Sequence, residues 1–168
     1  MKHNVFVVDT RNCVGCLACE IACKQEHSTD AGAAWIRVRK EDPREIEGRL
    51  RLRYDVEYCL HCTNPSCKDA CPVDAITKRD DGAVLIDEKA CIGCSACVDA
   101  CSLGMMQFDE KKGLAQKCDL CVSRTDRGLL PACAAACISH CIYFGDMAEI
   151  TARAPELIKL LKDKDVAG

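Results

Sequence analysis

The chain has few of the residues that normally fill a protein core, and no run that could span a membrane. Only 4% of its 168 residues are aromatic, and Trp35 is the single tryptophan. No uninterrupted apolar stretch approaches the ~20 residues of a membrane helix. Residues 1–9 carry no apolar secretory stretch, and we find no twin-arginine signal or transit peptide. A nucleophile–base arrangement, a paired-carboxylate site and a phosphate-binding glycine loop are also lacking, so we expect no catalytic site.

Cysteine, by contrast, is abundant, with 17 residues of which all but one fall into four groups of four. The first and third groups read C-x2-C-x2-C-x3-C, and the second reads C-x2-C-x4-C-x3-C followed by Pro72. The fourth keeps the x2 and x3 intervals but has eleven residues in its middle gap. The groups are Cys13, Cys16, Cys19 and Cys23; Cys59, Cys62, Cys67 and Cys71; Cys91, Cys94, Cys97 and Cys101; and Cys118, Cys121, Cys133 and Cys137.

The x2-x2-x3 spacing is typical of bacterial ferredoxins, whose cysteines hold cubane [4Fe–4S] clusters. Cluster iron selects soft thiolate ligands over imidazole or carboxylate. Four residues of helix rise about 6 Å, so the third and fourth cysteines of a group can reach different clusters. Motifs are therefore expected in pairs, and four motifs predict four [4Fe–4S] clusters.

Three other interpretations of the cysteines compete with clusters. A disulfide scaffold would suit a short secreted chain, but the spacings match a cluster motif. Zinc would suit the fourth group taken alone, since four thiolates in two pairs form a common structural zinc site. A radical enzyme uses three cysteines in a different spacing. Beside three ferredoxin-type runs, clusters remain the favoured interpretation of all four groups.

Clusters also change the expected charge and stability of the protein. The formal charge is −3, and four oxidised clusters with their thiolates add about −8. The basic residues are needed to offset this charge, which argues against nucleic-acid binding. Because the apolar core is thin, we expect the cluster-free chain not to fold.

The pattern of elements predicts an α+β protein built by duplication, in which a cysteine loop, a short helix and a short strand repeat. Residues 49–108 have the length of a two-cluster ferredoxin, and residues 1–48 with 109–146 would form a second unit around it. The expected architecture is thus one four-cluster domain over 1–146, with one pseudo-ferredoxin inserted into another, and a helical tail over 147–168. Helix is expected at 15–27, and strands at 5–9, 35–39, 50–58, 76–78, 83–86, 105–108 and 142–144.

The chain resembles the four-cluster ferredoxin-like electron-transfer (beta) subunits of molybdenum and tungsten oxidoreductases. The resemblance runs from about Val5 to Asp146 and includes CVGCLACEIACKQEH, CLHCTNPSCKDACP, CIGCSACVDAC and KCDLCVSRTDRGLLPACAAAC. Only the second motif has a proline after its fourth cysteine. The resemblance implies that each cluster takes three cysteines from one motif and one from another: Cys59, Cys62, Cys67 with Cys101; Cys91, Cys94, Cys97 with Cys71; Cys13, Cys16, Cys19 with Cys137; and Cys118, Cys121, Cys133 with Cys23.

Several residues near the motifs have open roles at this point. Cys141 is the unpaired cysteine, and we interpret it as a small buried side chain, with Cys137 as the ligand. His61 and His140 could donate a hydrogen bond to a cluster, although a structural or solvent-facing role is favoured for both. Lys117 and Arg124 either offset cluster charge or are simply solvated.

We therefore expect a non-catalytic relay that passes single electrons between a partner's Mo/W-pterin site and another redox centre. Chains of this size resemble the small subunits of tungsten aldehyde oxidoreductases, and a flavin subunit is a further expected partner. The alternative is a free, diffusible polyferredoxin. Self-association with a second copy remains open, and the cytoplasm is the expected compartment because cluster assembly needs reduced thiols.

Overall fold

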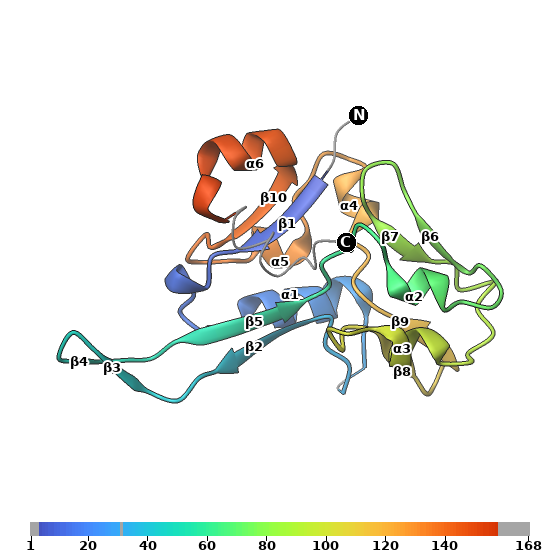
Figure 1. Cartoon of the computed structure of the whole chain (residues 1–168), viewed down its shortest axis with the longest axis horizontal. Helices are drawn as coiled ribbons and strands as arrows, with labels where there is room; N and C mark the ends of the chain where they lie inside the picture. Colours follow the sequence, from blue (N-terminus) through green and yellow to red (C-terminus); the bar gives the residue numbers. More distant parts are fainter. Residues whose placement is uncertain (1–3, 31, 158–168) are drawn as a thin grey trace.

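The computed structural model, which describes residues 4–30 and 32–157, combines short helices with two-stranded antiparallel sheets (Figure 1). This mixture agrees with the expected α+β composition. In chain order the elements are β1 (Asn4–Val8), η1 (Thr10–Asn12), α1 (Ala18–His27), β2 (Ile36–Lys40), β3 (Arg44–Ile46), β4 (Arg49–Arg51), β5 (Tyr54–Tyr58), α2 (Ser66–Asp69), β6 (Ile76–Lys78), β7 (Val84–Ile86), α3 (Ala96–Ala100), β8 (Gln107–Asp109), β9 (Leu114–Gln116), α4 (Val122–Thr125), α5 (Ala132–Ala135), β10 (Ile142–Asp146) and α6 (Met147–Arg153).

The first and last strands of the described chain form one sheet. β1 pairs antiparallel with β10, with Val5 opposite Gly145 and Val7 opposite Tyr143. α6 follows β10 directly, and the Asp146 carboxylate caps it by accepting a hydrogen bond from the Ala148 N–H at 2.9 Å. This pairing brings the segment before the first cysteine motif beside the segment after the fourth.

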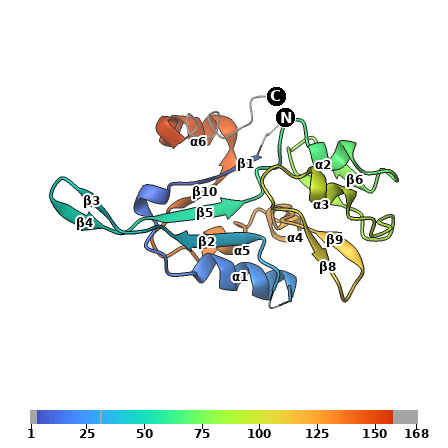
Figure 2. The same ribbon diagram turned by 60° about the horizontal axis from the view of Figure 1, so that its bottom comes forward.

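Cysteines provide much of the largest buried cluster, which lies between the β2–β5 sheet, α1 and α5 (Figure 2). Phe6 packs edge-on against Tyr58 at its border, with the ring centroids 5.0 Å apart. The composition predicts such a thin apolar core, and thiols here occupy places that aliphatic side chains usually fill. The buried members are Val8, Ile36, Val56, Tyr58, Cys19, Cys23, Cys133, Cys137 and Cys141.

The strand expected over 50–58 is divided in two, and this prediction was wrong in extent. β5 begins at Tyr54 and pairs with β2, whereas β4 pairs with β3 in a ribbon that extends away from the body (Figures 1 and 2). All three residues of β4 are exposed. The alternating pattern continues through both strands, but the core begins only at β5, so the first half of the pattern has nothing to pack against.

Two further hairpins flank α2 and α3 at the opposite end of the molecule (Figure 1). β6 and β7 form the hairpin expected around the Asp-Asp-Gly turn. β8 begins at Gln107 rather than 105, and it pairs with β9, which the sequence analysis did not predict. The turn between them is stabilised by Asp109, whose carboxylate accepts hydrogen bonds from the N–H groups of Lys111 and Lys112 at 3.0 Å each.

α1 begins at Ala18, three residues later than expected, because Gly15 and Leu17 have left-handed backbone conformations. At the other end of the chain, the tail packs on its own body. Leu157 is fully buried, in a cluster with Ile150 and the side chains of β1. The rest of the tail expected to be helical, residues 158–168, lies outside the described residues. Within the described part of the chain, no helix is both long and apolar enough to cross a membrane.

Candidate metal centres

The cysteine loops of the first and third motifs share one backbone conformation. Gly15 and Gly93 have φ angles of 68° and 69°. Leu17 and Ser95, which immediately precede α1 and α3, have φ angles of 63° and 62°. Two left-handed residues in each loop turn the chain tightly and place the third cysteine in the first turn of a helix. The x2-x2 spacing therefore produces the close curl that a multi-thiolate site needs.

Twelve of the sixteen predicted ligand cysteines line three separate cavities, and each cavity gathers four of them. Each combines three cysteines of one motif with one cysteine of another, in the groupings that the resemblance implies. With open solvent included, the cavities contain about 410, 330 and 320 Å³ of unfilled space. We name them the Cys59 site (Cys59, Cys62, Cys67 and Cys101), the Cys13 site (Cys13, Cys16, Cys19 and Cys137) and the Cys91 site (Cys71, Cys91, Cys94 and Cys97).

The remaining four predicted ligand cysteines are Cys23, Cys118, Cys121 and Cys133, and we name this group the Cys118 site. Burial, followed by the nearby Cys121 thiolate, raises the pKa of Cys23 to about 12. Burial and the charges of Cys121 and Cys23 raise the pKa of Cys133 far above its usual value. Burial raises the pKa of Cys118 well above the ordinary value, and the charge of Cys59 adds to the effect. These effects indicate that Cys133 is a neighbour of Cys23, Cys121 and Cys118.

The chemistry of these cysteines fits a four-thiolate cluster. Burial is the main cause that raises the pKa of Cys19, Cys67 and Cys121 to about 11 each. Such thiols stay protonated at neutral pH unless a metal binds them, because a coordinating thiol is deprotonated by the ion itself. Backbone N–H groups already point at sulfur: Ala75 N–H donates to Cys71 Sγ at 3.3 Å, and Leu120 N–H donates to Cys118 Sγ at 3.4 Å.

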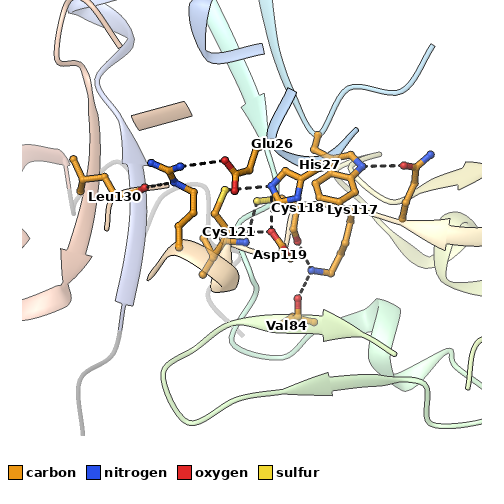
Figure 3. Close-up of polar contacts among 12 residues, drawn as sticks. Glu26, His27, Val84, Lys117, Cys118, Asp119, Cys121 and Leu130 are labelled. Carbon is orange, nitrogen blue, oxygen red and sulfur yellow. Dashed lines mark hydrogen bonds and ion pairs between the residues drawn. The ribbon is translucent and has the colours of Figure 1, made fainter. Parts of the chain in front are cut away.

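A histidine that the sequence analysis did not single out contacts the Cys118 site. His27 Nε2 lies 3.2 Å from Cys121 Sγ and 3.5 Å from Asp119 Oδ1 (Figure 3). Its ring packs on Trp35, with the centroids 4.5 Å apart. His27, Asp119 and Cys121 offer three ligand atoms within 4.8 Å of one another, but Cys121 already belongs to the Cys118 site. His27 follows Cys23 by four residues on one helix, a spacing that could have revealed this contact.

Arg124 joins α1 to the loop that carries the fourth motif. Its guanidinium lies 3.1 Å from Glu26 Oε2, and its Nε donates to the Leu130 carbonyl at 3.0 Å (Figure 3). Since Arg124 is partly buried, this ion pair fixes the two segments that together supply the Cys118 site.

Lys117 is buried rather than solvated, at 4% exposure. Its ammonium donates hydrogen bonds to the Val84 carbonyl and to the Cys118 carbonyl, the latter at 2.7 Å (Figure 3). It also lines the Cys59 site, beside His61. Burial, followed by the positive charges of Lys117 and Lys78, holds the pKa of His61 well below its usual value. His61 is therefore a buried neutral imidazole, whereas His140 is exposed.

Cys141 is buried next to Cys137, with the two Sγ atoms 3.5 Å apart. Burial raises the pKa of Cys141 to about 12. Burial acts in the same direction on Cys137, but hydrogen bonds from Ser139 and from backbone N–H groups outweigh it and hold the pKa of Cys137 below its ordinary value. Cys137 therefore has the lower pKa of the two, and Cys141, which lies against it, has the higher one.

Together these sites define a ferredoxin-type iron–sulfur protein. Two family profiles, both described as a 4Fe-4S dicluster domain, match residues 50–147 and residues 12–75. The chain belongs to this 4Fe-4S dicluster family, and two dicluster domains correspond to four [4Fe–4S] clusters, as the cysteine groups predict.

Curated relatives cover nearly the whole chain. A tetrathionate reductase subunit of Salmonella typhimurium is 35% identical over 163 residues, which are 94% of this chain and 64% of the relative. A subunit of the anaerobic dimethyl sulfoxide reductase of Escherichia coli is 35% identical over 159 residues, or 90% of this chain and 78% of the relative. A putative dimethyl sulfoxide reductase iron-sulfur subunit of Halobacterium salinarum is 32% identical over 176 residues, or 88% and 67%. The protein thus spans about two thirds to three quarters of the length of these relatives.

Proposed function

We propose that this protein is the electron-transfer subunit of a molybdenum or tungsten oxidoreductase complex. It would pass single electrons between a partner's Mo/W-pterin site and another redox centre, such as a flavin subunit. The observation that carries the proposal is the gathering of twelve cysteines into three cavities with four predicted ligands each, in a chain whose relatives are named as subunits of reductases. These names also favour a subunit over a free polyferredoxin.

In this proposal the cysteines of each named site are the ligands of one [4Fe–4S] cluster. Each cluster supplies a centre that accepts one electron and releases one electron, so the protein returns to its starting state after each transfer. The protein itself makes and breaks no substrate bond. Its side chains set the burial, the nearby charges and the hydrogen bonds to sulfur, and these features determine the reduction potential of each site.

Contacts between the sites support a linear order. α2 and α3, which carry Cys67 and Cys97, pack together, and Ser66 Oγ donates to the Ala100 carbonyl at 2.9 Å. The Cys91 site is therefore next to the Cys59 site. The effect of Cys59 on the pKa of Cys118 indicates that the Cys118 site follows the Cys59 site.

The Cys13 site comes last in this order. α1 carries Cys19 of the Cys13 site and Cys23 of the Cys118 site. The charge of Cys19 also contributes to the raised pKa of Cys133. The order Cys91 site, Cys59 site, Cys118 site, Cys13 site would make the protein a linear electron-transfer chain. One end of this chain would lie in each half of the molecule.

The same contacts support the inserted arrangement of two pseudo-ferredoxins. α2 packs on α3 within residues 49–108, and α1 packs on α5 across the interruption. The β1–β10 sheet closes the outer unit, which comprises residues 1–48 and 109–146. Duplication followed by insertion accounts for the shared backbone of the Gly15 and Gly93 loops.

The two sites at the ends of this electron-transfer chain are also the ones with solvent-exposed cysteines. Of the 17 cysteines only Cys16 and Cys94 are exposed, and they belong to the Cys13 and Cys91 sites at opposite ends of the order. Exposed apolar side chains lie near both of these cysteines. Such apolar surface is typical of a docking site for a protein partner. They are Val14 and Leu17 for the Cys13 site, and Val73 and Ile92 for the Cys91 site.

Anaerobic purification of the native complex tests this function. The account expects molybdenum or tungsten to co-elute with the protein at a fixed ratio to iron. A monomer-sized species that contains iron alone would contradict it and favour the free carrier. The cytoplasm is part of the proposal, because assembly on sixteen thiols needs a reducing compartment. Fractionation that finds the complex elsewhere would overturn that part only.

A further inference from the structure

We infer that His61 donates a hydrogen bond from Nε2–H to the cluster in the Cys59 site, and that this site therefore has a higher reduction potential than the Cys91 and Cys13 sites. The inference rests on the ligand assignment of the proposed function. It concerns a side chain of the second cysteine loop that supplies no ligand.

The tautomer of His61 is fixed by the backbone. His61 Nδ1 lies 2.9 Å from the Val84 N–H and accepts its hydrogen bond. A backbone amide can only donate, so Nδ1 carries no proton, and the proton of the neutral ring is on Nε2. Lys117 donates to the carbonyl of the same Val84 residue, so β7 is held in the position that fixes this tautomer.

His61 Nε2 is a buried donor without an acceptor. The residue is 9% exposed, and Nε2 has no hydrogen-bond partner among the described residues. Leaving such a donor unpaired costs about 1–3 kcal/mol, and buried polar groups in native proteins normally have a partner. His61 lines the cavity of the Cys59 site together with all four of its cysteines. A cluster there presents thiolate and sulfide sulfur, the acceptors that the site otherwise lacks.

The three cavities differ in the polar groups that face them. His61 and Lys117 both line the Cys59 site. No histidine, lysine or arginine is among the described residues that line the Cys91 and Cys13 cavities, where serine is the only hydroxyl side chain. A hydrogen-bond donor and a cation stabilise the more negative, reduced form of a cluster, so they raise its potential. Electrons would therefore settle on the Cys59 site before the Cys91 and Cys13 sites.

Two substitutions separate the hydrogen bond from the structural role of His61. Its φ angle is 51°, a left-handed conformation that asparagine adopts more readily than most residues. The side-chain oxygen of His61→Asn can replace Nδ1 as acceptor of the Val84 N–H, but the shorter side chain removes the Nε2 donor. In His61→Gln, the longer amide can place an N–H donor near the position of Nε2. His140→Asn is the matched control, because His140 is exposed and has a φ angle of 50°.

The experiment is an anaerobic redox titration of the holoprotein followed by electron paramagnetic resonance, with iron counted in each sample. We expect His61→Asn to shift one of the two highest of the four midpoint potentials to a more negative value and to leave the other three unchanged. His61→Gln should recover most of the shift, and His140→Asn should leave all four potentials unchanged.

Full iron content with no shift in His61→Asn would overturn the inference and leave the proposed function intact. A shift in one of the two lowest potentials would overturn it as well. If His61→Asn holds less iron, His61→Gln decides: unchanged potentials support the inference, and a negative shift or a lost cluster overturns it. Wild-type protein with fewer than four clusters would instead contradict the ligand assignment on which the inference rests.

Discussion

Replacing Gly93 by alanine tests the close approach of the third cysteine loop to the β8–β9 hairpin. A Cβ atom on Gly93 would lie 2.2 Å from the carbonyl oxygen of Gly113. This atom belongs to the backbone of a tight turn, so it cannot move aside as a flexible side chain could. Gly113 is a matched control, since its φ angle of +68° is almost the same as the +69° of Gly93 and nothing lies within 4 Å of its Cβ position.

The destabilisation caused by Gly93→Ala should exceed that caused by Gly113→Ala only by the cost of the contact with the Gly113 carbonyl. Each places a side chain in the left-handed region, which costs about 1–2 kcal/mol. Gly93→Ala adds the overlap with the carbonyl, and forcing extra volume into a packed site costs about 1–3 kcal/mol. For a chain of this size 1 kcal/mol lowers the melting temperature by about 2–4 °C, so Gly93→Ala should melt about 2–12 °C below Gly113→Ala.

Thermal loss of the visible iron–sulfur absorption, measured anaerobically on holoprotein, reports the difference. Because both variants start from glycine, the change in unfolded-chain entropy is the same and cancels. Equal melting temperatures would refute the close contact between the Cys91 loop and the hairpin. A lower melting temperature for Gly113→Ala than for Gly93→Ala would refute the argument that a Cβ atom fits at Gly113 but not at Gly93.

Four further substitutions test the buried lysine, the two neighbouring cysteines and the tail. Lys117→Met should destabilise the holoprotein by about 2–6 kcal/mol, because two buried carbonyls lose their donor, and unchanged thermal bleaching would contradict this. Cys137→Ala should remove the signal of one intact cubane in Mössbauer spectra, whereas Cys141→Ala should retain all four cubane signals. The reverse result would make Cys141 the ligand in place of Cys137. Leu157→Ala should cost about 2–5 kcal/mol, since the side chain is fully buried, and a change below 1 kcal/mol in denaturant unfolding would show that the tail is not packed in solution.

Much of the local structure follows from short-range signals in the sequence. The Asp-Asp-Gly turn correctly predicts the β6–β7 hairpin, and the apolar runs predict β1 and β10 within one or two residues. The start of α1 was placed too early because Leu17, which has no intrinsic preference for a positive φ, is held left-handed by its cysteine loop. Propensity does not show such a constraint.

The parts that the sequence did not predict depend on distant contacts. β9 is a three-residue strand, and only its pairing with β8 across the Asp109 turn makes it one. Whether the pattern at Leu50 continues a buried strand depends on where the core ends in space, and the side chain is 74% exposed. The environment of Lys117 could not be predicted either, because its partner Val84 lies 33 residues away in the chain.

An anaerobic reductive titration of the purified holoprotein, with iron counted and Mössbauer spectra taken on the same sample, tests the central claim most directly. The four-cluster relay predicts about sixteen irons per chain, all in cubanes, and an uptake of about four electrons. Fewer than three reducible clusters, or zinc in place of iron at the Cys118 site, would contradict it.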